Sequence, residues 1–151
     1  MSQRKGFTLV ETLMVVVILG ALVLIAYPKV SAGMLQSNLR SSRTTTANML
    51  AKARIAAMQS NRSTWIKFQG NRVWVIARPR RKPPLTEQVD TIGAVQDLMA
   101  LYGSTVSFPG DSIQYDPRGW ASGFATDSVV TISHGGKYQD IMLDGLGRVR
   151  K

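Results

Sequence analysis

The chain has no cysteine, a single histidine and almost no acidic side chains in its first half. The lack of cysteine excludes disulfides, thiolate metal sites and cysteine nucleophiles, although it does not identify the compartment. The histidine, His134, stands beside Gly135 and Gly136 in a predicted turn, where a lone histidine is far more often a surface residue than a catalytic base. No phosphate-binding glycine loop, metal-ligand spacing or nucleophile motif is present. We therefore expect no enzymatic activity, no catalytic residue, no bound metal and no cofactor.

Acidic residues are missing between Glu11 and Glu87, a stretch that holds twelve lysines and arginines. From Glu87 to the C-terminus eight acids face five bases, and the formal net charge of the chain is +10. A basic front half suggests a polyanionic partner, such as nucleic acid, anionic lipid or an acidic protein face. A solvated surface without any such partner explains the same charge distribution equally well.

An almost unbroken apolar run covers residues 7–27, behind a short basic segment. As a helix it is about 30 Å long, which is enough to cross the hydrocarbon core of a bilayer. Arg4 and Lys5 precede the run, so the positive-inside tendency keeps the N-terminus in the cytoplasm and directs the rest outward. Three interpretations are open: a signal peptide with a small-residue cleavage site at Ala32, a plain signal anchor, or an assembly helix.

Glu11 places a carboxylate inside the apolar run. A charged side chain in the membrane costs about 2.5–3.5 kcal/mol on insertion scales, so it normally has a partner or a purpose. Neither a signal peptide nor an inert anchor needs such a residue. The segment Lys5-Gly6-Phe7-Thr8-Leu9-Val10-Glu11 resembles the signature of type IV prepilins.

That resemblance implies cleavage by prepilin peptidase after Gly6, methylation of Phe7 as the new first residue, and an assembly role for Glu11. In a filament the Glu11 carboxylate could pair with the N-terminal amine of a neighbouring Phe7, so that only assembly satisfies the buried charge. The expected partners are other pilins or pseudopilins, the peptidase and the inner membrane, with the C-terminal domain in the periplasm. Pilins commonly carry a helix-kinking proline where Pro28 stands; alternatively, Pro28 ends the membrane helix.

Residues 29–62 predict a continuation of the helix, with its weakest helical portion at residues 41–46, which are rich in serine and threonine. Apolar residues recur there at three- and four-residue spacings and form one stripe. We expect this stripe to pack against the domain that follows; its members are Leu35, Leu39, Ala47, Leu50, Ala53, Ala57 and Met58.

Beyond residue 62 the apolar residues alternate, which predicts strands. Trp65 and Trp74 lie in a predicted hairpin, and we expect them to pack in the core or on a sheet face. The remaining predicted elements are a helix over 86–101 that stops at Gly103, a strand over 112–115, a turn over 116–119, a hairpin of 129–133 and 138–143, and a last strand over 146–151.

The predicted fold class is α+β: a long N-terminal transmembrane helix packed on a small C-terminal antiparallel β domain. The expected segments are a leader peptide (1–6), a transmembrane and assembly helix (7–28), its periplasmic continuation (29–62) and a β-rich domain (63–151).

A long helix before an all-β domain resembles the GspH/FimT branch of the pseudopilins. Three local patterns carry this resemblance: residues 53–58 before the tryptophan hairpin, Tyr115-Asp116-Pro117-Arg118-Gly119, and Gly147-Arg148-Val149-Arg150. Tyr115 departs mildly from the pattern, since another aromatic such as phenylalanine is common there. The resemblance implies a minor subunit of a type II secretion or type IV pilus filament.

Arg148 and Arg150 flank one residue, so in a strand their guanidinium groups face the same side, about 6.6 Å apart. Arginine suits bidentate contacts to adjacent phosphates. A Gly-Arg-x-Arg ending resembles the DNA-binding motif of FimT-like minor pilins, which implies non-specific DNA binding during DNA uptake. The residues involved would be Arg148, Arg150 and Lys151, with the basic loop residues Arg80, Arg81 and Lys82. The alternative is a solvated edge strand whose charges discourage aggregation, and secretion pseudopilins have similar endings.

Overall fold

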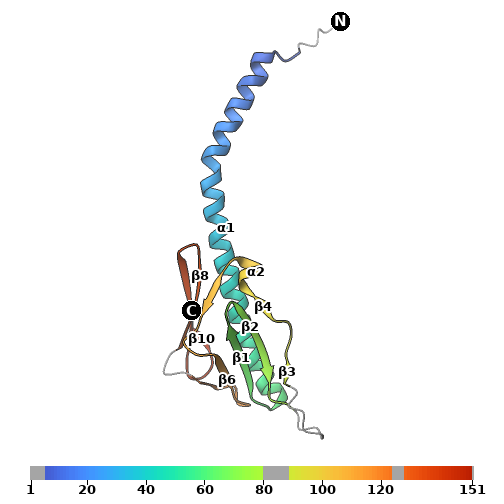
Figure 1. Cartoon of the computed structure of the whole chain (residues 1–151), viewed down its shortest axis with the longest axis vertical. Coiled ribbons are helices and arrows are strands. Elements are labelled where there is room, and N and C mark those ends of the chain that lie inside the picture. The colour runs from blue at the N-terminus through green and yellow to red at the C-terminus, as the bar shows by residue number, and fades with distance from the viewer. Residues whose placement is uncertain (1–5, 80–88, 124–127, 151) are drawn as a thin grey trace. The chain divides into compact units, whose positions relative to one another are not determined.

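The computed structural model describes residues 6–79, 89–123 and 128–150 of the chain. Within them a 52-residue helix, α1 (Leu9–Ser60), is followed by antiparallel strands and one short helix (Figure 1). The chain divides into two compact units, residues 1–36 and residues 37–151, and α1 contributes to both. The predicted α+β class is confirmed.

Thr8 caps the N-terminus of α1. Gly6, Phe7 and Thr8 lie outside the helix, and Thr8 Oγ1 accepts a hydrogen bond of 3.3 Å from the backbone N–H of Glu11. Threonine at the N-cap with glutamate three residues later is the capping-box sequence, which explains why the helix begins at this point. The Glu11 side chain stands in the first turn, where the helix dipole favours a negative charge.

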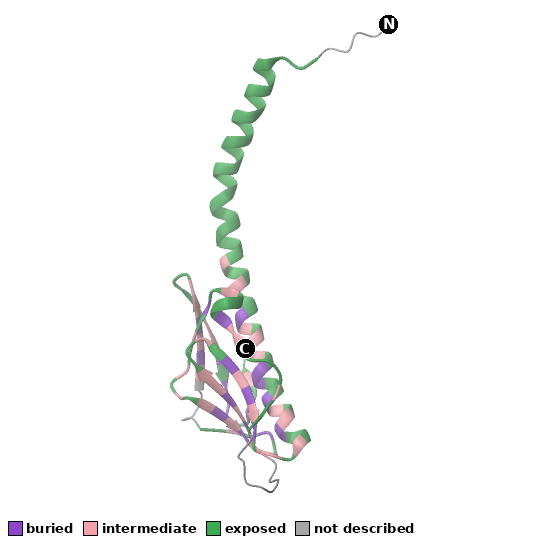
Figure 2. Cartoon of the chain, turned by 45° about the vertical axis from the view of Figure 1, so that its right-hand side comes forward, coloured by how far each residue is buried: buried purple, intermediate pink, exposed green. Residues whose placement is uncertain are grey.

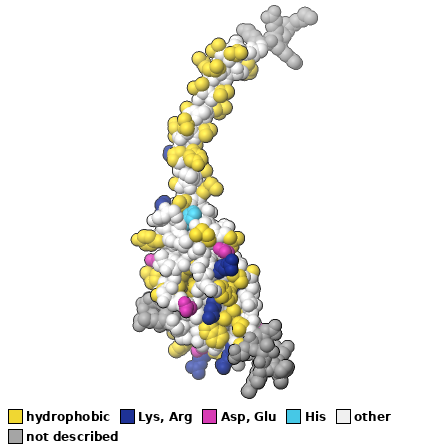
Figure 3. Space-filling model, viewed as in Figure 1, with side chains coloured by type: hydrophobic (Ala, Val, Ile, Leu, Met, Phe, Trp, Pro, Cys, Tyr) yellow, Lys and Arg dark blue, Asp and Glu magenta, His cyan; other side chains and the backbone are white. Residues whose placement is uncertain are grey.

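The N-terminal part of α1 has no packing partner in its unit: every residue from 6 to 34 is exposed (Figure 2). Apolar side chains project along it (Figure 3). With a mean hydropathy of 2.8 over an 18-residue window, α1 is long and apolar enough to cross a membrane. The helix continues through Pro28, so the alternative that Pro28 ends it is wrong. A proline removes one backbone hydrogen bond, and the strongly helical residues on both sides compensate for this loss.

The C-terminal half of α1 buries one face against the β domain. Its buried residues are Leu39, Ser42, Thr46, Met49, Leu50, Ala53 and Ala57. The predicted stripe is confirmed at Leu39, Leu50, Ala53 and Ala57, but it is wrong at Met58, which is 43% exposed. Sequence analysis missed the buried Ser42 and Thr46. Thr46 Oγ1 donates to the Ser42 carbonyl oxygen at 3.0 Å, which lets a hydroxyl enter the core with its hydrogen bond made.

Two antiparallel sheets complete the domain. Sheet A has the order β3-β2-β1-β6-β7, with β4 also paired to β2, and sheet B has the order β10-β9-β8-β5. The strands of sheet A are β1 (Thr64–Gln69), β2 (Arg72–Ala77), β3 (Asp90–Thr91), β4 (Gln96–Asp97), β6 (Ser112–Tyr115) and β7 (Ala121–Ser122). Those of sheet B are β5 (Thr105–Ser107), β8 (Ser128–His134), β9 (Lys137–Leu143) and β10 (Val149–Arg150). Both predicted hairpins, β1–β2 and β8–β9, are confirmed.

Alternation along the strands decides which side chains enter the core. Ile66, Val73 and Val75 are fully buried, and the strands of sheet B contribute Val130, Ile132, Ile141 and Leu143. Trp65 and Trp74 occupy the opposite parity and are only half-buried. Packing on a sheet face is therefore confirmed for the two tryptophans, and placement in the core is wrong.

The helix predicted over 86–101 is wrong at residues 89–97 and confirmed at residues 98–101. Residues 90–91 and 96–97 form strands β3 and β4 along β2, and only α2 (Leu98–Tyr102) is helical. Asp97 caps α2, because its Oδ1 accepts the backbone N–H groups of Met99 and Ala100 at 3.1 Å. Gly103 stops α2 in the left-handed conformation, as predicted. The backbone N–H and C=O groups at the free edge of β2 need hydrogen-bond partners. Pairing with them stabilises residues 90–97 as strands more than their weak helical propensity stabilises a helix.

Candidate functional site

One buried carboxylate, Asp144, holds both C-terminal arginines. Asp144 is 6% exposed, and its Oδ2 lies 3.0 Å from Arg148 Nε and 3.8 Å from Arg150 Nε. Its Oδ1 accepts the backbone N–H groups of Leu146 at 3.1 Å and Arg148 at 2.8 Å. The side chains of Arg148 and Arg150 are 58% and 65% exposed, so their guanidinium groups remain accessible to a ligand.

These contacts favour the ionised form of Asp144. The hydrogen bond from the Arg148 backbone N–H lowers its pKa most, and the Arg148 and Arg150 side chains lower it further against an opposing effect of burial. The carboxylate is therefore negative at neutral pH, where it orders the two arginines and offsets part of their charge.

Asp144 begins a turn that the domain builds twice, once at residues 116–119 and once at residues 144–147. In each turn the aspartate carbonyl oxygen accepts the N–H of the glycine three residues on, at 2.9 Å for Gly119 and 2.8 Å for Gly147. In each, the aspartate Oδ1 also accepts the N–H groups two and four residues on. The turn predicted at 116–119 is confirmed. The two turns share the spacing Asp-x-x-Gly in the sequence.

The two turns pack against each other and against α1. A Cβ on Gly147 would stand 2.8 Å from the Gly119 carbonyl oxygen and 2.7 Å from Tyr115 Cε1. Arg54 of α1 donates its Nε–H to the same Gly119 oxygen at 3.0 Å. The three patterns noted in the sequence, at 53–58, 115–119 and 147–150, therefore meet in one place.

Tyr115 lies beneath these turns. It is fully buried, and within the described residues its hydroxyl has no hydrogen-bond partner. Burial raises the pKa of Tyr115 far above its usual value, and the charge of Arg54 only partly opposes this rise. The tyrosine is thus neutral at any physiological pH and serves as a core residue.

Several sequence predictions need correction or lie outside the described residues. The strand predicted over 146–151 is wrong at residues 146–148, because the Asp144 turn occupies them and β10 is only Val149–Arg150. His134 ends strand β8 and is not in the turn; its Nδ1 hydrogen-bonds the Gly103 carbonyl oxygen, which makes its role structural. Four predicted DNA-binding residues fall outside the described ranges: Arg80, Arg81, Lys82 and Lys151.

The N-terminal candidates lie together at the start of α1. Gly6 and Phe7 are exposed and precede the helix, and Glu11 is exposed in its first turn. In the ranges 6–79, 89–123 and 128–150, no group of three or more histidine, aspartate or glutamate side chains could hold a metal ion.

Residues 1–27 match the model of the prokaryotic N-terminal methylation motif. The fold is similar to a crystal structure of the type IV minor pilin FimU of Pseudomonas aeruginosa (strain PAO1), with a TM-score of 0.57 and 14% sequence identity. The match covers 76% of this chain and 88% of the FimU chain. The chain therefore combines a prepilin-type N-terminal motif with the fold of a minor pilin. Pilin-like proteins are structural subunits that are not known as enzymes, in agreement with the prediction that this chain is not an enzyme.

A second crystal form of the same FimU protein matches the pilin-like chain with a TM-score of 0.53 and 14% identity, over 74% of this chain and 90% of the other. No curated protein sequence matches it significantly. The pilin fold implies assembly with other pilins in a filament. The methylation motif together with the apolar helix indicates that the pilin-like protein is anchored in a membrane.

Proposed function

We propose that the protein is a minor pseudopilin of the GspH/FimT kind, a structural and assembly subunit of a type II secretion or type IV pilus filament. Glu11 carries this proposal, because it is the only charged residue in the segment 7–27. In this proposal the helix sits in the inner membrane and the domain formed by residues 37–151 lies in the periplasm until the subunit enters the filament.

Processing and assembly are linked through the first turn of α1. Prepilin peptidase would cut after Gly6 and leave a free amine on Phe7, which is then methylated. The amine and the Glu11 carboxylate are opposite charges in an apolar environment, where an unpaired charge is costly and a paired one is far less so. Pairing between neighbouring subunits would therefore favour the assembled state.

Three variants test the proposal in a strain that makes the filament. The wild-type chain should lose residues 1–6 and begin at Phe7, as read by mass spectrometry, whereas Gly6→Leu should stay uncut. Glu11→Val should be cut normally, yet its amount in sheared filaments should fall by about tenfold or more, equivalent to 1.4 kcal/mol of lost pairing. Thr12→Val is the matched control in the same helix turn and should assemble normally. Normal incorporation of Glu11→Val would contradict the assembly role.

A second function, non-specific DNA binding during DNA uptake, is favoured by the arrangement at Asp144. Arg148 and Arg150 point their exposed guanidinium groups to one carboxylate, so both are partly ordered before a ligand arrives. Ordered side chains lose less conformational entropy on binding phosphates. In this proposal Lys151 and the basic loop residues Arg80, Arg81 and Lys82 add to the positive surface.

Salt titration distinguishes this function from simple surface charge. The domain of residues 37–151 would be titrated with duplex DNA at several salt concentrations, beside the double variant Arg148→Ala/Arg150→Ala. Loss of two phosphate contacts should lower the slope of log K against log salt by about 1.8. The control, Arg72→Ala/Lys137→Ala, removes the same charge from other exposed positions. An equal loss in both double variants, or no binding by the wild type at low salt, would rule out a site at the C-terminal arginines.

A further inference from the structure

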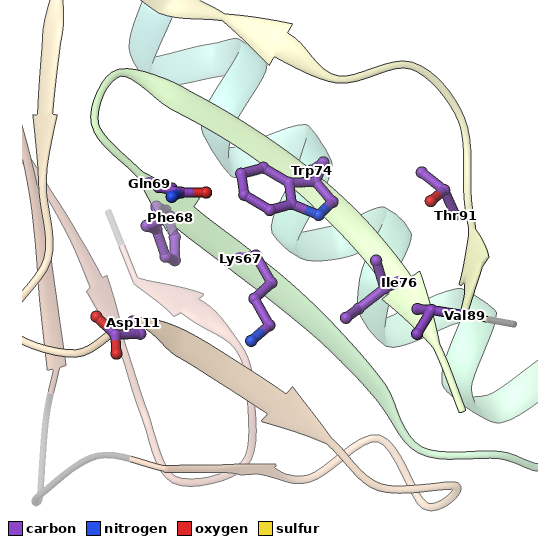
Figure 4. Close-up of a pocket in the computed structure, with 8 residues that line it drawn as sticks. All are labelled: Lys67, Phe68, Gln69, Trp74, Ile76, Val89, Thr91 and Asp111. Atoms are coloured by element: carbon purple, nitrogen blue, oxygen red, sulfur yellow. The ribbon is translucent and has the colours of Figure 1, made fainter. Parts of the chain in front are cut away.

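The outer face of sheet A carries an open groove of about 640 Å³. Figure 4 shows that its lining comes from β1, β2, β3 and the segment that leads into β6. The lining residues are Lys67, Phe68, Gln69, Trp74, Ile76, Val89, Thr91 and Asp111. The volume falls within the range of about 300–1,000 Å³ that is typical of small-ligand sites.

Strand register fixes the centre of the groove. Trp74 of β2 lies directly opposite Lys67 of β1, and Ile76 lies opposite Thr91 of β3. Lys67 also faces Ser112 of β6, which places Asp111 at the end of the groove beyond the lysine. The half-buried indole of Trp74 thus has a cation on the next strand and a carboxylate one strand further (Figure 4).

The polar groups of the groove are available to a ligand. In the described part of the chain, the side chains of Lys67, Gln69, Thr91 and Asp111 make no hydrogen bond or ion pair with one another or with other groups. They supply an ammonium and an amide as donors, and a carboxylate, an amide and a hydroxyl as acceptors. Their formal charges sum to zero.

An aromatic ring beside one cation and one carboxylate favours some classes of ligand over others. A polyanion would meet the Asp111 carboxylate, and like charges at close range repel. A purely apolar ligand would desolvate Lys67 and Asp111 without pairing them, which is costly. A neutral sugar fits both features, because one face of a pyranose ring presents C–H groups to an aromatic ring while its hydroxyl groups radiate outward at the rim. We propose that this groove binds a neutral saccharide, with Trp74 as the platform and Lys67 and Asp111 as hydrogen-bonding partners.

The saccharide site goes beyond the assembly role and does not depend on it. The test uses the full chain in a detergent without a sugar headgroup, titrated with tri-N-acetylchitotriose and, separately, with cellotriose. Tryptophan fluorescence reports binding, because Trp74 is one of only three tryptophans in the chain. We expect saturable binding of at least one of the two sugars at concentrations below about 10 mM, an affinity that a single stacked ring with a few hydrogen bonds can supply.

Matched variants locate the site. Trp74→Ala should weaken binding by about tenfold or more, Trp74→Phe should retain much of it, and Trp120→Ala, which removes an exposed indole from the turn at 116–120, should leave it unchanged. Lys67→Met and Asp111→Asn should each weaken binding by about three- to tenfold without moving the melting temperature, since both side chains lie outside the core. No saturable signal with either sugar up to about 10 mM, or equal loss in Trp74→Ala and Trp120→Ala, would overturn the proposal.

Discussion

At the scale of single residues, the acidic side chain of Asp144 combines low exposure with contacts to two backbone N–H groups and two guanidinium groups. Arg54 plays a related part from α1 by donating to the carbonyl oxygen of the neighbouring turn. β10 has two residues, and the contacts of Asp144 add to its short pairing with β9.

Asp144→Asn should lower the melting temperature of the domain by several degrees, because the amide keeps the volume but loses the charge and one acceptor. Asp116→Asn is the matched control: it alters the other Asp-x-x-Gly turn, whose aspartate makes no ion pair with an arginine side chain among the described residues. Thermal denaturation followed by circular dichroism measures both. Equal effects of the two substitutions would show that the Arg148 and Arg150 contacts add nothing to stability.

The stability that Asp144 contributes should depend on pH. Its folded-state pKa is depressed below the ordinary value of 3.8, so the contribution is complete above that value and is lost as pH falls through the folded-state pKa. The difference in melting temperature between wild type and Asp144→Asn should therefore be constant from neutral pH to about pH 5 and shrink below about pH 4. A difference that persists unchanged in strong acid would contradict this assignment.

Sequence reasoning located Arg148 and Arg150 but not their partner. The two-residue spacing of the arginines is visible in the sequence, and so is the unusual carboxylate of Glu11. Nothing in the sequence marks Asp144 as that partner. The role of Asp144 depends on a turn that brings the residues four and six positions later back to its carboxylate. The spacing of apolar residues, from which helices and strands are predicted, does not reveal such a turn.

At the scale of elements, the paired turns depend on a glycine at a close approach. Gly147 has a φ of +71°, and an added Cβ would stand 2.8 Å from the backbone oxygen of Gly119. Gly147→Ala should destabilise the domain by at least about 2 kcal/mol, through strain and this collision. Gly145→Ala, in the same turn but with open space around it, should change stability by less than about 0.5 kcal/mol. Urea denaturation of the domain compares them, and similar values would argue against close packing of the two turns.

The buried face of α1 gives another prediction. Leu50 is fully buried, so Leu50→Ala should cost about 2–5 kcal/mol. Met58→Ala, at a position that is 43% exposed, should cost less than about 1 kcal/mol. Denaturant midpoints at constant m-value measure both changes. A cost for Met58→Ala as large as that for Leu50→Ala would show that Met58 packs in the core, as the stripe in the sequence predicts.

Local patterns predicted the two hairpins and the strand β6, but they failed over residues 90–97. The two hairpins are visible because their strands alternate and a turn with glycine joins them. Residues 90–97 look helical in isolation, but they pair with β2, a partner about twenty residues away in the sequence. Ser42 and Thr46 look too polar for a core, although hydrogen bonding of Thr46 within the helix makes burial inexpensive.

At the scale of the whole molecule, an apolar helix and a β domain are distinct in composition, which is why the fold class could be predicted. The order of strands in the sheets could not. β1 pairs with β6, so that Thr64 lies opposite Tyr115, and only the packed core selects that register. Residues 80–88 and 124–127 lie outside the described ranges, so their predicted contributions remain predictions.

The membrane assignment can be tested on the whole chain. The full protein should stay in the membrane fraction at alkaline pH, because α1 has a mean hydropathy of 2.8 over an 18-residue window and no partner in its unit. The domain of residues 37–151 alone should be soluble. Mass spectrometry of the membrane-bound form should give Phe7 as the first residue. A soluble product that begins at Gly33 would instead support an ordinary cleaved signal peptide.

The three residues before α1 bear on the cleavage that we propose after Gly6. Because Thr8 caps the helix, the peptide bond after Gly6 belongs to a segment that is not helical. A protease binds its substrate in an extended form, so an enzyme that cuts this bond would not have to unwind any helical turn first. The leader could therefore be removed without loosening the helix in the bilayer, and the cut chain would keep both its cap and the position of Glu11. Maturation and extraction would then be separable events, each with its own rate.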